Sequence, residues 1–385
     1  MAEQTQNLGR ARAAVYAAFF VAGAGLATWA SFIPLVQRRL ALGDAELGQA
    51  LFAMAAGALC AVVSAGAVIE RFGARGTTGV AGALFCVLLP GPVFAVSFWA
   101  LAGALLVFGF CFGLLDVAMN AQAADVQRLA RKPLMSGFHG LYSFGGLAGS
   151  ALAGLLFRLA VPGPTHVGGV VALLLVVTLF AWRGLLPTAP RAGRGPALSL
   201  PARRLAGLAV LGFLMFVGEG AVMDWANVYL ANVLRAPADL AVAGFAAFSF
   251  AMAAGRFGGD WATAHLGSSR FAVLSAMLGA AGLGLAIASG SVAVSVVGFA
   301  AAGLGFANLV PILFSQAAES TPEAPQQGIS GVAGVGYFGL VAGPPAIGFM
   351  AEELGLRGAL GIVACAMAFA AVSLPAAFRM ALRGQ

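Results

Sequence analysis

Charged residues are scarce in this chain of 385 residues. They make up 9% of the sequence, whereas hydrophobic residues make up 61% and the mean hydropathy is +0.95. A soluble domain covers its surface with roughly 25% charged residues, so this composition excludes an ordinary soluble fold. Lipid is the remaining solvent for so much apolar surface, and we expect an integral membrane protein.

The residues on which enzymes and ATP-driven pumps depend are also few. The single lysine, Lys132, precedes a proline, so no G-x-x-x-x-G-K-[ST] phosphate loop exists. No G-x-S-x-G or H-E-x-x-H motif occurs, and His166 and His265, in predicted loops, receive no role. We therefore expect that the protein is not an enzyme and that it has no cofactor and no metal site. Four cysteines without a C-x-x-C pair are predicted to be small buried hydrophobes: Cys60, Cys86, Cys111 and Cys365.

Long uncharged segments predict the fold. The charge-free gaps from Arg75 to Asp116 and from Arg270 to Glu319 can each hold two spans of about 20 residues. The apolar runs do not alternate, so helices are expected rather than a barrel. Twelve spans are predicted, at 13–37, 47–69, 77–96, 97–122, 134–157, 167–186, 205–230, 240–258, 271–288, 292–317, 327–351 and 358–378.

Basic residues predict the orientation. Sixteen of the 21 Lys and Arg residues are cytoplasmic if the N-terminus lies inside, as the excess of positive charge in cytoplasmic loops requires. We expect a multi-pass protein of the bacterial inner membrane with both termini cytoplasmic and no cleaved signal peptide. The same bias explains the net charge of +7 without a nucleic-acid partner.

An internal repeat divides the chain. A shift of 194 residues aligns Ser136 with Ser330 and Phe144 with Phe338, and a shift of 196 aligns Trp29 with Trp225. An all-α fold of two six-helix bundles related by pseudo-two-fold symmetry follows, with the site between the halves. The expected parts are a cytoplasmic N-terminus (1–12), an N-terminal bundle (13–186), a flexible linker (187–204), a C-terminal bundle (205–378) and a cytoplasmic tail (379–385).

A loop motif follows the second predicted span. It reads Gly66-Ala-Val-Ile-Glu70-Arg71-Phe72-Gly73-Ala74-Arg75 and is similar to the signature G-x-x-x-D-R-x-G-R of the major facilitator superfamily, with Glu70 in place of Asp. A degenerate copy after the eighth span contains Arg256 and Asp260, followed by Gly267 and Arg270. The chain therefore resembles that superfamily over its whole length.

This resemblance implies a secondary transporter. It also implies that the loop residues help to lock the halves in one of two alternating states, namely Glu70, Arg71, Arg75, Arg256 and Asp260; the alternative is a loop that only keeps its positive charge. The segments starting at Asp116 and Ser136 resemble, more loosely, the fucose-permease branch. The first span lacks the acid of that branch, so the substrate does not carry over.

Three of the fourteen acids fall inside predicted spans: Asp116, Glu219 and Asp224. An ionised carboxylate in the bilayer costs from about 2.5 to more than 10 kcal/mol, so it faces a cavity or a partner. No Lys or Arg is predicted deep in a span, which makes protonation the cheapest way to neutralise these acids. The pattern favours a proton-coupled or cation-accepting site over an anion carrier.

Asp116 is the leading candidate for proton coupling. Gly109, Gly113, Asp116 and Asn120 lie on one helical stripe, which indicates close packing next to a cavity; the alternative is a structural bond to a neighbouring helix. His139, which shares a face with Tyr142, is a second candidate, either as a proton shuttle or as a structural hydrogen-bond partner.

On the seventh span, Glu219 lies deeper than Asp224. The two are about 140° apart on a regular helix, so both face one cavity only if the helix is broken. Glu219 is preferred for proton coupling, and Asp224 is either an outer gate or interfacial. Trp29 and Trp225 are read as an aromatic wall for a ligand or as lipid-interface anchors. The candidate substrate-binding residues are Trp29, Asn120, Tyr142, Asp224, Trp225, Asn227, Asn308 and Tyr337.

The sequence thus predicts a proton-coupled transporter for a small neutral or cationic polar solute, with a sugar-like solute favoured. Its partners are expected to be that solute, protons and the lipid bilayer, and the protein is expected to be a monomer. A drug/proton antiporter is the alternative within transport. A non-transporting receptor with the same fold is the alternative from another class.

Overall fold

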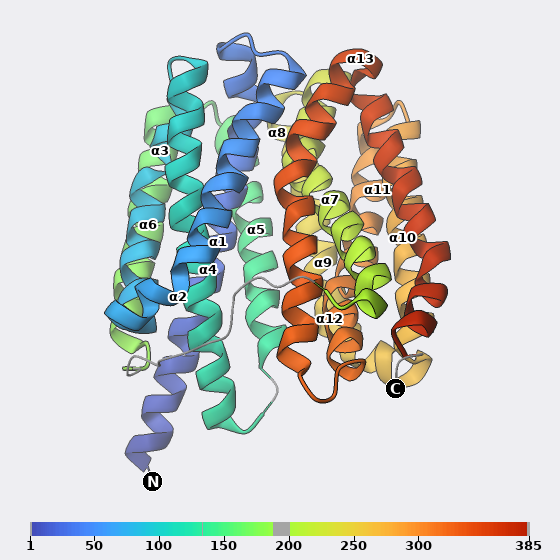
Figure 1. The fold of residues 1–385 in the computed structure, drawn as a ribbon. Helices are drawn as coiled ribbons and strands as arrows, with labels where there is room; N and C mark the ends of the chain where they lie inside the picture. The colour runs from blue at the N-terminus through green and yellow to red at the C-terminus, as the bar shows by residue number, and fades with distance from the viewer. Residues whose placement is uncertain (1, 133, 188–200, 383–385) are drawn as a thin grey trace. The chain divides into compact units, whose positions relative to one another are not determined.

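Long apolar helices follow one another along the chain. The computed structural model describes residues 2–132, 134–187 and 201–382, and the side chains of these residues apart from residues 2–7 and Asp260 (Figure 1). No strand occurs within these ranges. The helices before the polar segment are α1 (Ala2–Arg39), α2 (Asp44–Leu88), α3 (Pro90–Val93), α4 (Phe98–Ala130), α5 (Met135–Arg158) and α6 (Gly163–Gly184).

The second half begins with the short 3-10 turn η1 (Arg203–Leu205). The helices that follow are α7 (Ala206–Val228), the π-turn η2 (Tyr229–Val233), α8 (Ala238–Ala241), α9 (Ala243–Leu266), α10 (Ser268–Ala288), α11 (Val292–Phe306), α12 (Leu309–Glu319) and α13 (Pro325–Leu382).

Two helices, α2 and α13, each consist of two spans joined at a glycine. Gly73 has φ 72° and ψ 154°, and Gly355 has φ 71° and ψ 156°. This left-handed backbone suits glycine because it has no Cβ to clash. Ten described helices are long and apolar enough to cross a membrane, and the two kinked helices each supply two spans. The predicted all-α membrane fold of twelve helices is confirmed.

The chain divides into two compact units. Unit 1 comprises Met1–Ala41 and Ala53–Arg194, and unit 2 comprises Leu42–Phe52 and Gly195–Gln385. In unit 1, α1 packs against α4, α5 and α6; in unit 2, α7 packs against α13 and α9, and α10 packs against α11 (Figure 1). The predicted linker at 187–204 falls largely outside the described residues, and its boundaries stay a prediction.

The turns repeat with the register found in the sequence. Ala41 and Arg235, which follow the first helix of each half, both have left-handed backbones, with φ 51° and 57°. Gly73 and Gly267 also share a conformation, with φ 72° and 77°. Each pair is 194 residues apart, the shift that aligns Ser136 with Ser330. Equivalent turns at equivalent positions are what a duplicated bundle requires.

The predicted span at 292–317 is not one continuous helix. Phe306 ends α11 and Leu309 begins α12, and Asn308 between them has φ −115° and ψ 0°. Pro311 explains the break, because its ring clashes with the carbonyl group four residues earlier and it has no N–H to donate to that carbonyl. The carbonyl of Ala307 therefore has no helical donor at residue 311.

The cysteines differ from their prediction. Cys86 and Cys111 are buried, whereas Cys60 in α2 and Cys365 in α13 are exposed. A thiol on an apolar helix is compatible with a lipid-facing surface as well as with a protein core, and hydropathy does not distinguish the two positions. All four cysteines are free thiols.

Candidate functional site

The α7 acid Glu219 lies beside a basic residue of α9. Helix α7 is continuous through the Gly218-Glu219-Gly220 segment, so Glu219 points in a direction fixed by regular helix geometry. Its Oε1 lies 3.8 Å from Nη2 of Arg256, and each of the two side chains is 16% exposed. An ion pair in this setting is screened less than one on the surface. Unit 2 thus holds an acid–base pair open to solvent only in part.

This pair corrects two expectations. Arg256, near the end of the predicted eighth span, and Asp260, beyond it, were read as part of a loop motif, whereas both lie inside α9, which runs to Leu266. No basic residue was expected beside an interior acid, yet Arg256 is paired with Glu219. The error came from ending the eighth span too early. The Asp260 side chain lies outside the described part of the molecule, so its proposed gating role stays a prediction.

The helix break at Asn308 lies against the same stretch of α9. The Asn308 side chain donates through Nδ2 to the backbone carbonyl of Gly255 at 2.8 Å. A Cβ on Gly259 would overlap with the Asn308 amide, and one on Gly255 would lie 2.7 Å from the Ala307 side chain. Glycine therefore lets the break approach α9 next to Arg256. The Asn308 amide holds the break in place. The sequence analysis had predicted Asn308 to bind substrate and did not anticipate this structural role.

The outer part of α7 is largely buried. Asn227 is 1% exposed, and its Oδ1 accepts from the backbone N–H of Phe245 at 3.1 Å, so it caps the first turn of α9. Trp225 is fully buried, and its indole N–H has no acceptor in the described part of the chain. Asp224 next to it is half-buried. Tyr337 of α13 stacks on Phe216 of α7, with ring centroids 5.4 Å apart.

In unit 1 the predicted stripe on α4 is partly a packing surface. A Cβ on Gly113 would lie 2.7 Å from the Ala58 carbonyl, and one on Gly109 would overlap with the Met54 carbonyl, so both glycines pack on α2. Asp116, one turn further, accepts from Asn120 Nδ2 at 3.2 Å, and the same amide donates to the Asp116 carbonyl at 2.9 Å. Both side chains are half-buried, so this pair is the polar end of an otherwise tight interface.

Three more predicted residues lie in unit 1. Trp29 is 2% exposed, and its indole N–H has no acceptor among the described residues. Full burial rules out the alternative reading of Trp29, and equally of Trp225, as lipid-interface anchors. His139 packs edge-on against Phe19, with ring centroids 5.1 Å apart. Tyr142 is half-buried on the same helix, α5.

The loop motif surrounds the kink in α2. Gly73 forms the kink, Glu70 and Arg71 are exposed, and the Arg71 guanidinium lies over the Phe72 ring at 5.5 Å. Arg75 is different, because it reaches back to α6: its Nε and Nη2 donate to the carbonyls of Trp182 and Arg183 at 3.3 and 3.5 Å.

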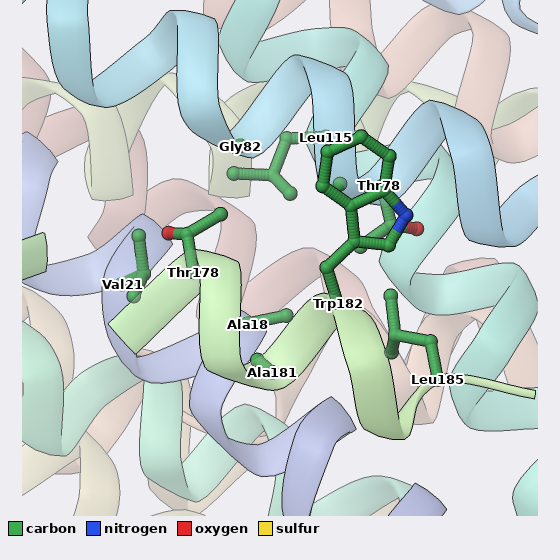
Figure 2. A pocket seen from close by; sticks show the side chains of 10 residues that line it. Ala18, Val21, Thr78, Gly82, Leu115, Thr178, Ala181, Trp182 and Leu185 are labelled. Atoms are coloured by element: carbon green, nitrogen blue, oxygen red, sulfur yellow. The ribbon is translucent and has the colours of Figure 1, made fainter. Parts of the chain in front are cut away.

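A small cavity lies inside unit 1 (Figure 2). It has room for about one water molecule, and its lining is almost wholly apolar. It contains none of the predicted site residues, so it is a packing defect rather than the transport site. The lining residues are Ala18, Val21, Thr78, Gly79, Gly82, Leu115, Thr178, Ala181, Trp182 and Leu185.

Sequence reasoning missed His166. It was read as a loop residue, yet it lies in the first turn of α6 and is 2% exposed, between the rings of Phe32 and Phe157 at 5.0 and 5.3 Å. Neither ring nitrogen has a partner within the described chain. Pro164, the second residue of α6, was the available signal, because proline is accommodated in the first turn of a helix.

Known proteins resemble the chain over nearly its full length. The Major Facilitator Superfamily profile matches residues 15–338. An uncharacterized MFS-type transporter of Yersinia pestis is 35% identical over 362 residues, which cover 94% of each chain.

Two solved structures share the fold. The nucleoside transporter NupG has a TM-score of 0.78 at 13% identity, covering 97% of this chain and 99% of that one. The E. coli fucose:proton symporter FucP has a TM-score of 0.62 at 15% identity, covering 95% and 98%. At these identities the likeness concerns the fold.

Proposed function

The chain belongs to the Major Facilitator Superfamily of membrane transporters, and on that premise we propose that it moves a small polar solute by alternating access coupled to protons. The observation that carries the proposal is the charge of the half-buried interior. Of the three acids inside predicted spans, Asp116, Glu219 and Asp224, only Glu219 is paired with a base among the described side chains, namely Arg256. Ionised acids at this depth require a partner, and a proton or a cationic group on the solute can supply it.

Arg256 divides the acids by role. Glu219 already has a cationic partner at 3.8 Å, so its charge is balanced without a proton. Asp116 accepts only from the neutral amide of Asn120, and neither it nor Asp224 forms an ion pair in the part of the chain that the structure describes. We therefore assign proton coupling to Asp116 first. Glu219 with Arg256 becomes a pair that exchanges partners when a charged or strongly polar solute binds.

A sugar-like solute remains the favoured class. Trp29 and Trp225 each present a buried indole N–H without an acceptor in the described chain, and a hydroxyl-rich solute offers acceptor oxygens as well as apolar faces for aromatic rings. The fold neighbours named above carry nucleosides and fucose by their names. The sequence argued against an anionic solute because no Lys or Arg was predicted deep in a span. The Arg256 guanidinium beside Glu219 removes that argument.

The test begins with purified protein in proteoliposomes. Thermal shift against sugars, nucleosides, amines and cationic drugs identifies a solute, and uptake is then driven by a proton gradient. We expect Asp116→Asn to abolish gradient-driven accumulation and to retain counterflow exchange. Glu353→Gln, which alters an exposed acid of α13, is the matched control. Accumulation by Asp116→Asn with the pH dependence of the wild type would overturn the assignment.

A drug/proton antiporter is the second candidate, because interior acids also suit cationic drugs. Loaded vesicles with an inward proton gradient separate the two, since only an antiporter extrudes the drug. A receptor would bind the solute in the thermal assay without moving it across the membrane.

Location and state complete the proposal. We place the protein in the bacterial inner membrane with both termini cytoplasmic, supported by the distribution of Lys and Arg, and we propose that it is a monomer. Cysteines introduced at either terminus should react with an impermeant maleimide only after the cells are opened.

A further inference from the structure

The C-terminal end of α6 is tied to α4 by one side chain. Gln122 of α4 is fully buried, and its amide forms two hydrogen bonds with the backbone of Leu186, just beyond α6. Nε2 donates to the Leu186 carbonyl at 3.1 Å, and Oε1 accepts from the Leu186 N–H at 3.0 Å. The side-chain amide thus pairs with both the N–H and the carbonyl of Leu186, as a neighbouring β-strand would. This pairing fixes Leu186 in position and in orientation.

The loop motif ties down the same end. The last carbonyls of an α-helix have no intrahelical donor, and a cation near them is favourable. Arg75 supplies both, because its guanidinium donates to the carbonyls of Trp182 and Arg183 at 3.3 and 3.5 Å. Gly73, two residues earlier, makes the kink that leads the chain to Arg75.

A third contact is apolar. The Trp182 ring lies on Gly79 so closely that a Cβ there would overlap with it. Figure 2 shows Trp182 projecting from α6 beside Thr78, with Leu185 at the end of the helix. All these contacts are made within unit 1. They hold the last turn of α6 and the residue that leads into the predicted linker.

We propose that Arg75 and Gln122 are positioning residues that clamp the end of α6, so that the chain leaves unit 1 from a fixed point. The resemblance of the loop motif implied a lock between the halves, whereas the clamp acts inside one bundle. The repeat supports this difference. Ser269 stands at the position equivalent to Arg75, with Arg270 one residue further, and Ala376 stands at the position equivalent to Trp182. Two of the clamp residues, Arg75 and Trp182, therefore have no like residue at the equivalent position of the second half.

Hydrogen exchange of the full-length protein tests the clamp without a transport assay. In Gln122→Leu, the Leu186 amide loses its acceptor, and we expect it to exchange up to about tenfold faster. Arg75→Gln should accelerate the same peptide to a smaller extent, because Arg75 binds carbonyls rather than this N–H. Arg71→Gln is the matched control from the same motif, and it should leave the peptide unchanged.

Combining the two changes gives a second readout. Because both residues hold one segment, Arg75→Gln with Gln122→Leu should accelerate exchange by less than the product of the single effects. Gln122→Asn, which shortens the side chain by one methylene, replaces Gln122→Leu if the latter does not fold. Unchanged exchange at 182–187 in the single variants, or an equal effect of Arg71→Gln, would overturn the proposal.

Transport, with rates divided by the amount of folded protein in the liposomes, adds a readout that simple loss of folded protein does not move. This part rests on the proposed function: in counterflow, the clamp variants should lose maximal rate several-fold while KM stays constant. A raised KM at full rate would contradict a positioning role. If hydrogen exchange at 182–187 rises in the clamp variants but the wild type transports no solute, the clamp proposal stands and the proposed function is rejected.

Discussion

Gly48 of α2 and Gly348 of α13 pack backbone against backbone within unit 2. A Cβ on Gly48 would lie 3.1 Å from the Cα of Gly348, and a Cβ on Gly348 would lie 3.0 Å from the Cα of Gly48. Close by, Glu352 accepts a hydrogen bond from the Ala45 N–H at 3.2 Å. The start of α2 is thus held on α13 by a contact that only glycine permits and by a carboxylate at the helix N-terminus.

Gly348→Val should weaken that contact. The added side chain has no room, so the segment Leu42–Phe52 must move away from α13, at a cost of about 1–3 kcal/mol. Hydrogen exchange at 44–52 should rise and the thermal midpoint should fall. Gly66→Ala, on α2 and with nothing within 4 Å of the new Cβ, should leave both unchanged. Wild-type protection at 44–52 in Gly348→Val would contradict the packing.

The Glu219–Arg256 pair predicts an asymmetry between single and double variants. Arg256→Gln leaves Glu219 without a cation and should destabilise the protein by up to about 3–5 kcal/mol; partial exposure lowers this figure. Glu219→Gln combined with Arg256→Gln removes both charges and should be milder. Thermal unfolding in one detergent gives the comparison. A double variant less stable than Arg256→Gln alone would show that the pair does not interact as described.

The left-handed glycines predict matched losses of stability in the two halves. Gly73→Ala and Gly267→Ala each place a Cβ at positive φ, which costs roughly 1–2 kcal/mol. Gly258→Ala is the control, since this helical glycine has open space around it and alanine favours the helix by up to about 1 kcal/mol. Opposite shifts of the thermal midpoint are expected. Equal shifts for all three variants would argue against the kinks.

The buried indoles predict opposite effects on stability and affinity. Trp29→Phe and Trp225→Phe remove a buried donor without a described acceptor, which relieves a desolvation penalty of about 1–3 kcal/mol against the loss of part of the ring. Stability without solute should therefore hold or rise, while the thermal shift caused by a bound solute should shrink. Trp99→Phe, at a side chain that is 80% exposed, should change neither. A full solute-induced shift in both Trp→Phe variants would remove the indoles from the site.

Hydropathy was sufficient to predict the membrane-spanning helices. It was not sufficient to predict which of their side chains face the protein interior. Long uncharged runs have one solution in lipid, so the twelve helices could be predicted. The break at Asn308 could not be read from Pro311 alone, because Pro34 and Pro344 lie inside continuous helices of the same chain. Positions facing lipid and positions facing protein are equally apolar, so the exposure of Cys60 and Cys365 could not be read from the sequence.

The site was harder to predict because it depends on contacts between helices. Asp116 and Asn120 lie on one helix, and their spacing predicted that they face the same way. Glu219 and Arg256 are 37 residues apart, on helices whose rotation is set by packing. No local pattern links them. The same holds for Gln122, whose partner is a backbone group 64 residues away.

The two exposed thiols give the protein a natural pair of attachment points. Cys60 belongs to unit 1 and Cys365 to unit 2, while Cys86 and Cys111 are buried. Each unit of the unmodified chain therefore carries one exposed thiol. Spin labels at these two positions would report the separation of the units in each transport state, with no engineered cysteine to disturb the helices.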